Sequence, residues 1–174
     1  MAKTIVQKDN PVLRATAERV PVKEITSPKI QAIIKEMRAA LKTQEDGAAL
    51  AAPQIGYPLR IFVVADNLFG SEEGARYKSG DNHLVYVNPE IIKLSRKKEL
   101  LDEGCLSVRG IYGTVARGVR ATVKAHDENG KLFERGASGL LAQVFQHEAD
   151  HLNGTLFIDK AEELWEVDLR KKDA

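Results

Sequence analysis

The spacing of apolar residues predicts a helix in the first quarter of the chain. Ser27 and Pro28 form a typical helix start, because a capping residue is followed by proline at the first helical position. The apolar residues that follow recur at helical spacing: Ile30, Ile33, Ile34, Met37 and Leu41. We therefore expect one face of this helix to pack against a core.

Short apolar runs bounded by turn residues predict strands in the next part of the chain. Residues 60–64 (RIFVV) are expected to form a mostly buried strand, and residues 84–87 (LVYV) another that ends at Asn88 and Pro89. Residues 66–83 between them are rich in glycine and charge, which indicates an exposed loop.

The second half of the chain combines alternating segments with one late helix. Residues 114–124 show some alternation, and with the turn at residues 129–130 and the KLFERG segment after it they predict a hairpin. A last helix is expected over about residues 138–153, with Gly154 as its stop. Strands gathered before one late helix favour an α+β fold over a regular βαβ array. A length of 174 residues favours one domain over residues 1–174.

Composition narrows the class of protein without indicating an activity. Apolar residues at 43% and charged residues at 29% are ordinary for a soluble globular protein. A net charge of +1 gives no case for nucleic-acid or membrane binding through bulk charge. One cysteine excludes an intrachain disulfide framework. No signal-peptide core and no membrane-length apolar run is visible, so we expect a cytoplasmic protein with no membrane partner.

The late helix contains a candidate metal site. His147 and His151 are four residues apart, close to one helical turn, so both imidazoles project from one face and can share one metal ion. At about 100° per residue both histidines and Glu148 fall inside the apolar stripe, whereas Gln146 and Asp150 are expected on the other side. A carboxylate in that stripe is costly to desolvate unless a charge compensates it, as a divalent cation would. The same spacing also occurs in helices that bind nothing.

Two histidines leave a catalytic metal one protein ligand short, because such sites commonly use three and keep one position open. Cys105 or a carboxylate could supply the third. Free cysteine is by base rate a buried small hydrophobe. Cys105, however, lies between Gly104 and a Val-Arg-Gly loop, where a thiolate that a metal keeps ionised fits well.

Three separated motifs resemble those of the peptide deformylase family. Residues 47–56 (GAALAAPQIG) look like its G-x-G-L-A-A-P-Q-I-G segment, residues 103–107 (EGCLS) like its E-G-C-L-S, and residues 146–151 (QHEADH) like its Q-H-E-x-D-H. The motifs follow the family's order, with similar spacing. Weaker similarity at residues 10–14 (NPVLR) and 87–89 (VNP) extends the match over nearly the whole chain.

The resemblance implies one divalent metal ion, usually Fe²⁺ in the family, with Zn²⁺, Ni²⁺ or Co²⁺ able to occupy the site. Its implied ligands are Cys105, His147 and His151. Glu148 would be the general acid/base, and Gln54 with the backbone N–H of Leu106 would stabilise the oxyanion.

The implied reaction is hydrolysis of the formyl group from N-formylmethionine at the start of nascent polypeptides, releasing formate. A metal-bound water would attack the formyl carbon, while Glu148 takes up a proton and delivers it to the leaving amine. The implied partners are formylmethionyl nascent peptides and, transiently, the ribosome. No sequence-specific nucleic-acid binding is expected.

The substrate cleft is expected to run along the first two motifs. Its predicted lining is Gly47, Ala48, Ala49, Leu50, Glu103, Gly104, Arg109 and Tyr112. Three positions depart from the family pattern: Ala49 replaces a glycine and would narrow the cleft, Arg109 replaces a proline, and Tyr112 replaces an arginine expected to contact substrate. We hypothesise that Arg109 partly takes over that contact, the alternative being a solvated arginine. Glu103 is expected to orient a metal ligand or to brace Arg109 or another cation.

Two other functions fit the motifs. A zincin-like metallopeptidase would share the H-E-x-x-H spacing and take its third ligand downstream, from Asp159 or Glu162. A non-catalytic metal-binding relative would keep the fold and metal without turnover. Residues 161–174, at the end of the chain, are expected to form a short helix docked on the same domain, using Leu164, Trp165 and Leu169.

Overall fold

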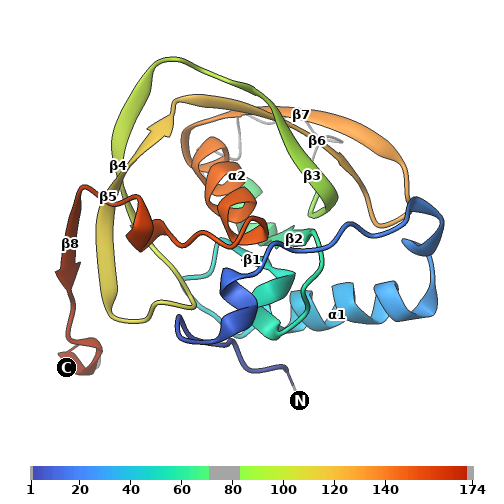
Figure 1. The fold of residues 1–174 in the computed structure, drawn as a ribbon, viewed down its shortest axis with the longest axis horizontal. Coiled ribbons are helices and arrows are strands. Elements are labelled where there is room, and N and C mark those ends of the chain that lie inside the picture. Colours follow the sequence, from blue (N-terminus) through green and yellow to red (C-terminus); the bar gives the residue numbers. More distant parts are fainter. Residues whose placement is uncertain (1, 71–82, 172–174) are drawn as a thin grey trace.

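The computed structural model describes residues 2–70 and 83–171 (Figure 1). Its helices and strands are α1 (Pro28–Lys42), β1 (Ala49–Ala51), β2 (Ile61–Val64), β3 (Val85–Leu94), β4 (Lys98–Gly104), β5 (Ile111–Gly118), β6 (Arg120–His126), β7 (Leu132–Ser138), α2 (Gly139–Leu152) and β8 (Glu163–Glu166). Short 3-10 helices cover Pro11–Arg14, Val22–Glu24, Ala52–Ile55, Asp66–Gly70, Phe157–Asp159 and Leu169–Lys171. The α+β prediction is confirmed. The described residues contain no helix that is both long and apolar enough to cross a membrane.

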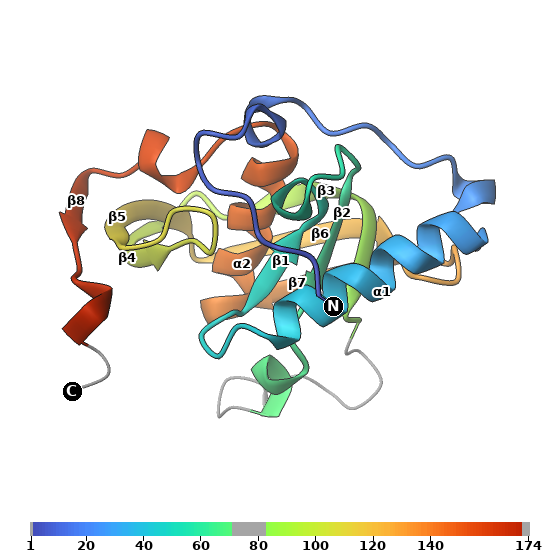
Figure 2. The same ribbon diagram turned by 90° about the horizontal axis from the view of Figure 1, so that it is seen from below.

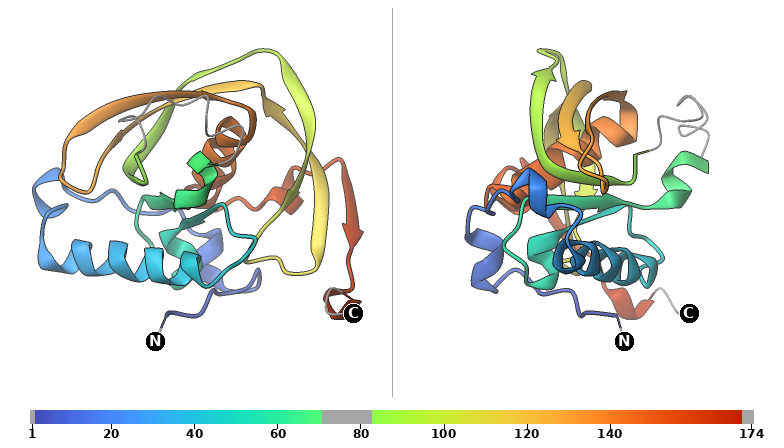
Figure 3. Two further views of the ribbon diagram at one scale, coloured as in Figure 1. Left: turned by 180° about the vertical axis from the view of Figure 1, so that it is seen from behind. Right: turned by 90° about the vertical axis from the view of Figure 1, so that its right-hand side faces the viewer.

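The strands form two antiparallel sheets around α2. The larger sheet has the order β1-β2-β3-β6-β7 and the smaller one the order β4-β5-β8. Helix α2 contacts β1, β3, β6 and β7 of the larger sheet and β5 of the smaller one. In Figure 3 it lies inside the curve of the larger sheet, while α1 runs along the outside. The helix that carries the candidate metal ligands is therefore enclosed by strands on several sides.

The core explains why β2 consists only of apolar residues. Ile61 and Val63 pack in the cluster that contains the apolar face of α1, whereas Phe62 and Val64 pack in the cluster that contains α2. Because successive side chains of a strand point to opposite faces, a strand covered by a helix on each side has no polar position. Residues 61–64 of the predicted strand 60–64 are confirmed.

Both predicted helices are confirmed close to their expected bounds. Ser27 caps α1, its Oγ accepting a hydrogen bond from the N–H of Ile30 at 3.4 Å. Helix α2 ends one residue before Asn153, and Gly154 follows with a φ of +75°. The hairpin is confirmed as β6 and β7, with Gly130 at a φ of +80° in its turn.

The predicted end of the second strand at Asn88 is wrong, because β3 continues to Leu94. Two residues of β3, Asn88 and Pro89, face a single residue of β6 at a register shift. Asn88 adopts a φ of +51°, and its side chain bonds both backbone groups of Val20, at 2.8 and 2.7 Å. This bulge carries the strand past a proline that cannot donate a ladder hydrogen bond.

Three further expectations need adjustment. Residues 114–124 belong to two strands of different sheets, β5 and β6, rather than to one alternating segment. Residues 163–166 form strand β8 on the edge of β5 instead of a helix. Gly113 permits this pairing, since a Cβ there would lie 2.6 Å from the carbonyl oxygen of Glu163. The loop expected over 66–83 begins as a 3-10 helix, and its residues 71–82 lie outside the described part of the chain.

Candidate metal centre and cleft

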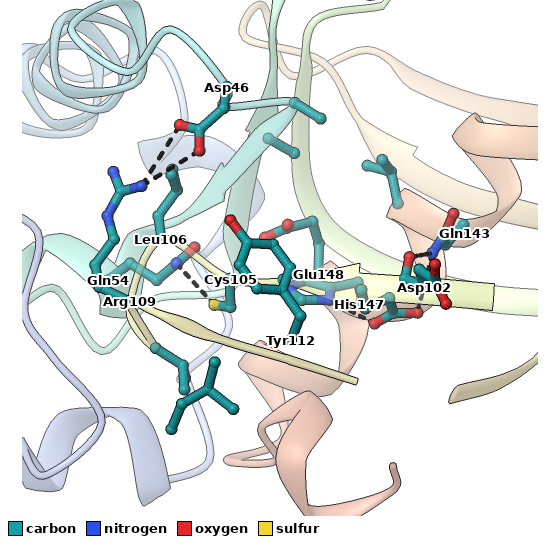
Figure 4. A pocket seen from close by; sticks show the side chains of 18 of the residues that line it. Asp46, Gln54, Asp102, Cys105, Leu106, Arg109, Tyr112, Gln143, His147 and Glu148 are labelled. Atoms are coloured by element: carbon teal, nitrogen blue, oxygen red, sulfur yellow. Dashed lines mark hydrogen bonds and ion pairs between the residues drawn. The ribbon is translucent and has the colours of Figure 1, made fainter. Parts of the chain in front are cut away.

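An open cavity of about 300 Å³ lies where the two sheets and α2 meet. Its walls are the segment around β1, the end of β4 with the loop after it, the start of β5, and α2 (Figure 4). The following predicted residues line it: Gly47, Ala48, Ala49, Gln54, Glu103, Gly104, Cys105, Leu106, Arg109, Tyr112, His147 and Glu148. Sequence reasoning missed Asp46, Asp102, Val108, Gly110, Ile111, Leu140, Gln143 and Val144, which also line it.

Leu50 was predicted to line the cleft, and this is wrong. Its side chain is fully buried in the cluster that contains α1. The alternation of β1 explains the error, because Ala49 and Ala51 pack on the α2 side and Leu50 must then point to the opposite face.

The three predicted metal ligands lie together. The ligand atoms of Cys105, His147 and His151 are all within 4.8 Å of one another. Cys105 Sγ lies 3.3 Å from Nε2 of His151, so these two metal-donor atoms are in contact. Asp159, the ligand that a zincin-like site would use, instead accepts hydrogen bonds from Arg14 and from the N–H of Leu156.

The electrostatics of the cluster favour an ionised thiol. Burial raises the pKa of Cys105, but the positive charges of His151 and His147 and their hydrogen bonds outweigh it and lower the pKa to about 5. Burial lowers the pKa of His147, but its hydrogen bonds with Cys105 and Glu103 raise it well above 6.5. A thiolate beside two imidazoles is a donor set that suits a divalent transition metal.

Glu148 adds a buried carboxylate with an unfilled hydrogen-bonding capacity. It is 4% exposed, and burial raises its pKa, opposed by the positive charges of His151 and His147. Its Oε2 has no hydrogen-bond partner among the described residues. A buried carboxylate oxygen left without a partner is costly, so its place at the cavity wall fits a site that receives a polar group. The residues present therefore fit a metal and its water.

Glu103 connects the three predicted metal ligands to a buried arginine. Its carboxylate accepts a hydrogen bond from Nδ1 of His147 at 2.8 Å and two from Arg117 at 2.6 and 2.7 Å. Burial raises the pKa of Glu103, but the hydrogen bonds from Arg117 and His147 lower it to about 2. Because Nδ1 of His147 is engaged, Nε2 is the nitrogen left to face the cluster. Of the roles expected for Glu103, its bond to His147 fits the orienting of a predicted metal ligand, and the cation that it contacts is Arg117 rather than Arg109.

The side of α2 opposite its apolar stripe is enclosed as well. Gln146 is 7% exposed, donates to the carbonyl of Gly118 at 2.9 Å and accepts from its N–H at 2.8 Å. Asp150 accepts from Arg117 at 2.7 Å and from Lys160 at 2.8 Å. Strands on this side of the helix supply the partners that water would otherwise provide.

Gln54 and Leu106 lie beside the cluster. Gln54 is 1% exposed, and its Oε1 accepts from the N–H of Ala51 at 2.9 Å. Its Nε2 donates to Oγ of Ser107 at 3.1 Å and lies 3.6 Å from Sγ of Cys105. The backbone N–H of Leu106 has no acceptor in the described part of the chain.

Two of the three residues that depart from the family pattern, Arg109 and Tyr112, lie at the cavity wall. The guanidinium of Arg109 contacts Gln44 and the Asp46 carboxylate, whose oxygens lie 3.4 and 3.5 Å away (Figure 4). The ring of Tyr112 lies over Gly104, where a Cβ would come within 2.6 Å of Cε1. Because glycine has no side chain, position 104 leaves room for the tyrosine ring.

Comparison with known proteins gives consistent matches. A family model described as polypeptide deformylase matches residues 2–166. The chloroplastic peptide deformylase 1A of Solanum lycopersicum is 42% identical over 162 residues, which cover 90% of this chain but only 58% of the tomato protein. The peptide deformylase of Syntrophomonas wolfei is 43% identical over 157 residues, 90% of this chain and 91% of that protein. A Met-Ala-Ser-bound crystal structure of a peptide deformylase from Acinetobacter baumannii is 32% identical with a TM-score of 0.79, covering 92% of this chain and 98% of that one.

Proposed function

The chain belongs to the polypeptide deformylase family, and from this premise we propose that it is a metal-dependent hydrolase that removes the formyl group from N-formylmethionine at the start of nascent polypeptides. One observation carries the proposal: the ligand atoms of Cys105, His147 and His151 lie within 4.8 Å of one another, beside Oε2 of Glu148, which has no hydrogen-bond partner among the described residues. The same proposal includes transient association with the ribosome and a cytoplasmic location.

The resident ion in this proposal is Fe²⁺, with Zn²⁺, Ni²⁺ or Co²⁺ as substitutes, because thiolate and imidazole donors accept several divalent metals. Such an ion, held by Cys105, His147 and His151, would polarise the formyl carbonyl and lower the pKa of a water molecule. The thiolate and the Glu103-oriented imidazole of His147 supply the donors.

Glu148 moves the proton in this reaction. Its carboxylate takes a proton from the attacking water, and burial, which raises its pKa, makes it a better base than an exposed glutamate. The new bond joins the water oxygen to the formyl carbon. When the carbon–nitrogen bond breaks, Glu148 returns the proton to the leaving amine, so formate and a free amino terminus result.

Two donors are placed to stabilise the negative charge on the formyl oxygen. Gln54 Nε2 has two protons: one is donated to Oγ of Ser107 at 3.1 Å, and the other faces Sγ of Cys105 at 3.6 Å. We propose that the proton facing Cys105 and the N–H of Leu106, which has no acceptor among the described residues, stabilise the oxyanion. Because both donors are held by the fold before the reaction, they need no rearrangement as the charge develops.

Formate release from formyl-Met-Ala-Ser, measured anaerobically with Fe²⁺, tests the proposal. Glu148→Ala should lower the rate by about 10²–10⁴, the usual contribution of a general acid/base. Cys105→Ser should lower both the rate and the metal retained after dialysis. Glu162→Ala is the matched control, since this exposed glutamate would be a ligand only in a zincin-like site.

The outcomes separate the three functions. Absence of metal-dependent formate release by the wild-type chain would indicate a non-catalytic relative. Metal binding that survives Cys105→Ser, together with cleavage of unformylated peptides, would indicate a metallopeptidase.

Arg109 is proposed to contact the peptide beyond its methionine. It lies at the cavity wall, where Asp46 and Gln44 hold its guanidinium. Arg109→Ala should lower kcat/KM for a formyl-Met peptide, and an unchanged value would leave Arg109 as a surface arginine.

A further inference from the structure

Gln7 reaches from the N-terminal segment to the loop between β4 and β5. Its Nε2 donates to the carbonyl oxygen of Leu106 at 3.0 Å, and its Oε1 accepts from the N–H of Arg109 at 3.3 Å. Figure 2 shows the N-terminal segment running past this loop. One amide side chain thus bridges two ends of a short turn, which suits glutamine because it offers a donor and an acceptor together.

The residue before Gln7 holds the other side of the same site. The N–H of Val6 donates to the carbonyl oxygen of Gln54 at 2.9 Å. Two successive residues of the N-terminal segment therefore fix the backbones of Gln54 and Leu106. These are the residues whose donors face the formyl oxygen in the proposed reaction.

The other restraints on the loop act at different positions from those of Gln7. Within it, the N–H of Val108 donates to the carbonyl oxygen of Cys105 at 3.0 Å. Outside it, the side chain of Arg109 contacts Asp46, and these two side chains are 37% and 51% exposed. Exposed pairs of this kind contribute little to local order. Gln54 Nε2 donates to Oγ of Ser107 at 3.1 Å, and the N–H of Val167 donates to the carbonyl oxygen of Gly110 at 2.8 Å. Among the described residues, the bonds from Gln7 are those that reach the backbones of Leu106 and Arg109 themselves.

We propose that Gln7 is a positioning residue that holds the Leu106 turn so that its N–H points at the developing oxyanion. The catalytic effect rests on the proposed deformylase function, whereas the two hydrogen bonds by which Gln7 clamps the turn do not depend on it. A donor displaced from the oxyanion by a fraction of an ångström stabilises the transition state less, while ground-state binding of the peptide changes little.

Gln7→Ala tests the proposal in the full, metal-loaded chain. We expect kcat for formyl-Met-Ala-Ser to fall by about tenfold, less than the 10²–10³ lost when an oxyanion donor is removed outright, with KM within about twofold. Affinity for Met-Ala-Ser, which lacks the formyl oxygen, should stay unchanged. Hydrogen exchange of the Val108 amide should accelerate, whereas exchange of the Ala17 amide, bonded to Leu152 at 2.9 Å, should not.

Gln31→Ala is the matched control. Gln31 also bridges backbone groups, donating to the carbonyls of Ile25 and Glu128 at 2.8 and 2.9 Å, but it does not line the cavity. Its loss should leave kcat and Val108 exchange at wild-type values. Gln7→Glu is a second test, since it keeps an acceptor for Arg109 but replaces the donor to Leu106, and it should lower kcat at least as far as Gln7→Ala.

Three results would overturn the proposal: an unchanged kcat in Gln7→Ala, an equal loss in Gln31→Ala, or a loss of Met-Ala-Ser affinity as large as the loss of kcat. If the wild-type chain releases no formate, the proposed function fails. Val108 exchange then still decides whether Gln7 clamps the turn.

Discussion

Replacing Arg117 with methionine removes the cation at the centre of the buried network behind α2. Arg117 donates to both oxygens of Glu103, at 2.6 and 2.7 Å, and to Asp150 at 2.7 Å. The side chains of Arg117 and Glu103 are each 3% exposed. The substitution keeps most of the volume but leaves the carboxylate of Glu103 buried, with His147 at 2.8 Å and Gln143 at 3.4 Å as the remaining donors.

Two independent routes give the size of the effect. Removing one partner of a buried ion pair usually costs about 3–5 kcal/mol, because the other charge stays buried without compensation. Arg117 and His147 together lower the pKa of Glu103 from its ordinary 4.5 to about 2 in the folded chain, which corresponds to about 3 kcal/mol at about 1.36 kcal/mol per pKa unit. We therefore expect Arg117→Met to lower the free energy of unfolding at pH 7 by about 3–4 kcal/mol.

The pH dependence follows from the direction of the pKa change. Because the pKa of Glu103 is lower in the folded state, its contribution to stability is full above pH 4.5 and disappears as pH falls toward 2. The difference between wild type and Arg117→Met should therefore shrink to less than half of its neutral value by about pH 3.

Urea denaturation of the metal-free chain at pH 7 and pH 3 measures both quantities, since bound metal would add its own stabilisation. Arg14→Met is the control, because Arg14 and its partner Asp159 are 44% and 37% exposed and such a pair contributes about 1 kcal/mol or less. A loss below 1 kcal/mol at pH 7, or an equal loss at both pH values, would refute the reasoning. The double variant Glu103→Met/Arg117→Met should recover stability relative to the single one, but not activity, because His147 loses its Nδ1 partner.

Two further predictions concern the glycine after α2 and the charge at the cavity wall. Gly154→Ala should destabilise the chain by more than about 2 kcal/mol, because position 154 has a φ of +75° and the new Cβ would lie 2.5 Å from the carbonyl oxygen of Arg14. Gly130→Ala is the control, because position 130 has a φ of +80° and the nearest atom to a new Cβ would be 3.8 Å away. It should lose only the cost of the left-handed backbone conformation, about 1–2 kcal/mol. Equal losses of stability in thermal unfolding would contradict a steric clash at position 154. Asp46→Asn frees the charge of Arg109 and should raise kcat/KM about 2–5-fold for formyl peptides with an acidic residue after the methionine, relative to neutral ones. The gain should vanish in Asp46→Asn/Arg109→Ala, and its persistence there would exclude Arg109 as the cause.

The parts of the fold that could be predicted are those that depend on neighbours in the chain. Helix α1 begins with a local capping pair, and its apolar face is set by residues three or four positions apart. The spacing of His147 and His151 places both imidazoles on one helix face whatever surrounds it. The approach of Cys105 to them could not follow from spacing, because 46 residues separate it from His151.

The errors occur where contacts with a distant segment override the structure that the local sequence predicts. Asn88 and Pro89 usually end a strand, but the bonds of Asn88 to Val20, 68 residues away, stabilise a bulge within β3. Residues 163–166 have apolar positions that suit a short helix. They form a strand because β5 offers an open edge with a glycine, which the local sequence cannot show.

The partners of Gln146 and Asp150 could not be read from the helical wheel, for a related reason. It assumes that a helix has one buried face, whereas α2 is enclosed by strands of both sheets (Figure 1). A polar residue on an enclosed helix must find protein partners, since water cannot reach it. Those partners lie 28 and 33 residues away, at Gly118 and Arg117.

The proposed metal ligands and the residues that hold them in position therefore differ in how far sequence alone can identify them. Metal-ligating side chains carry a recognisable chemistry, so their residue types and spacing already indicate a function. Their supports are ordinary residues whose role comes from a single long-range contact: Arg117 to Glu103, 14 residues apart, and Gln7 to Leu106, 99 residues apart. Because orientation of donors within about 0.5 Å decides catalytic rate, these supports should affect kcat although they touch neither metal nor substrate. Their substitution is the stronger test of the geometry, since removal of a ligand abolishes activity under any mechanism that uses the metal.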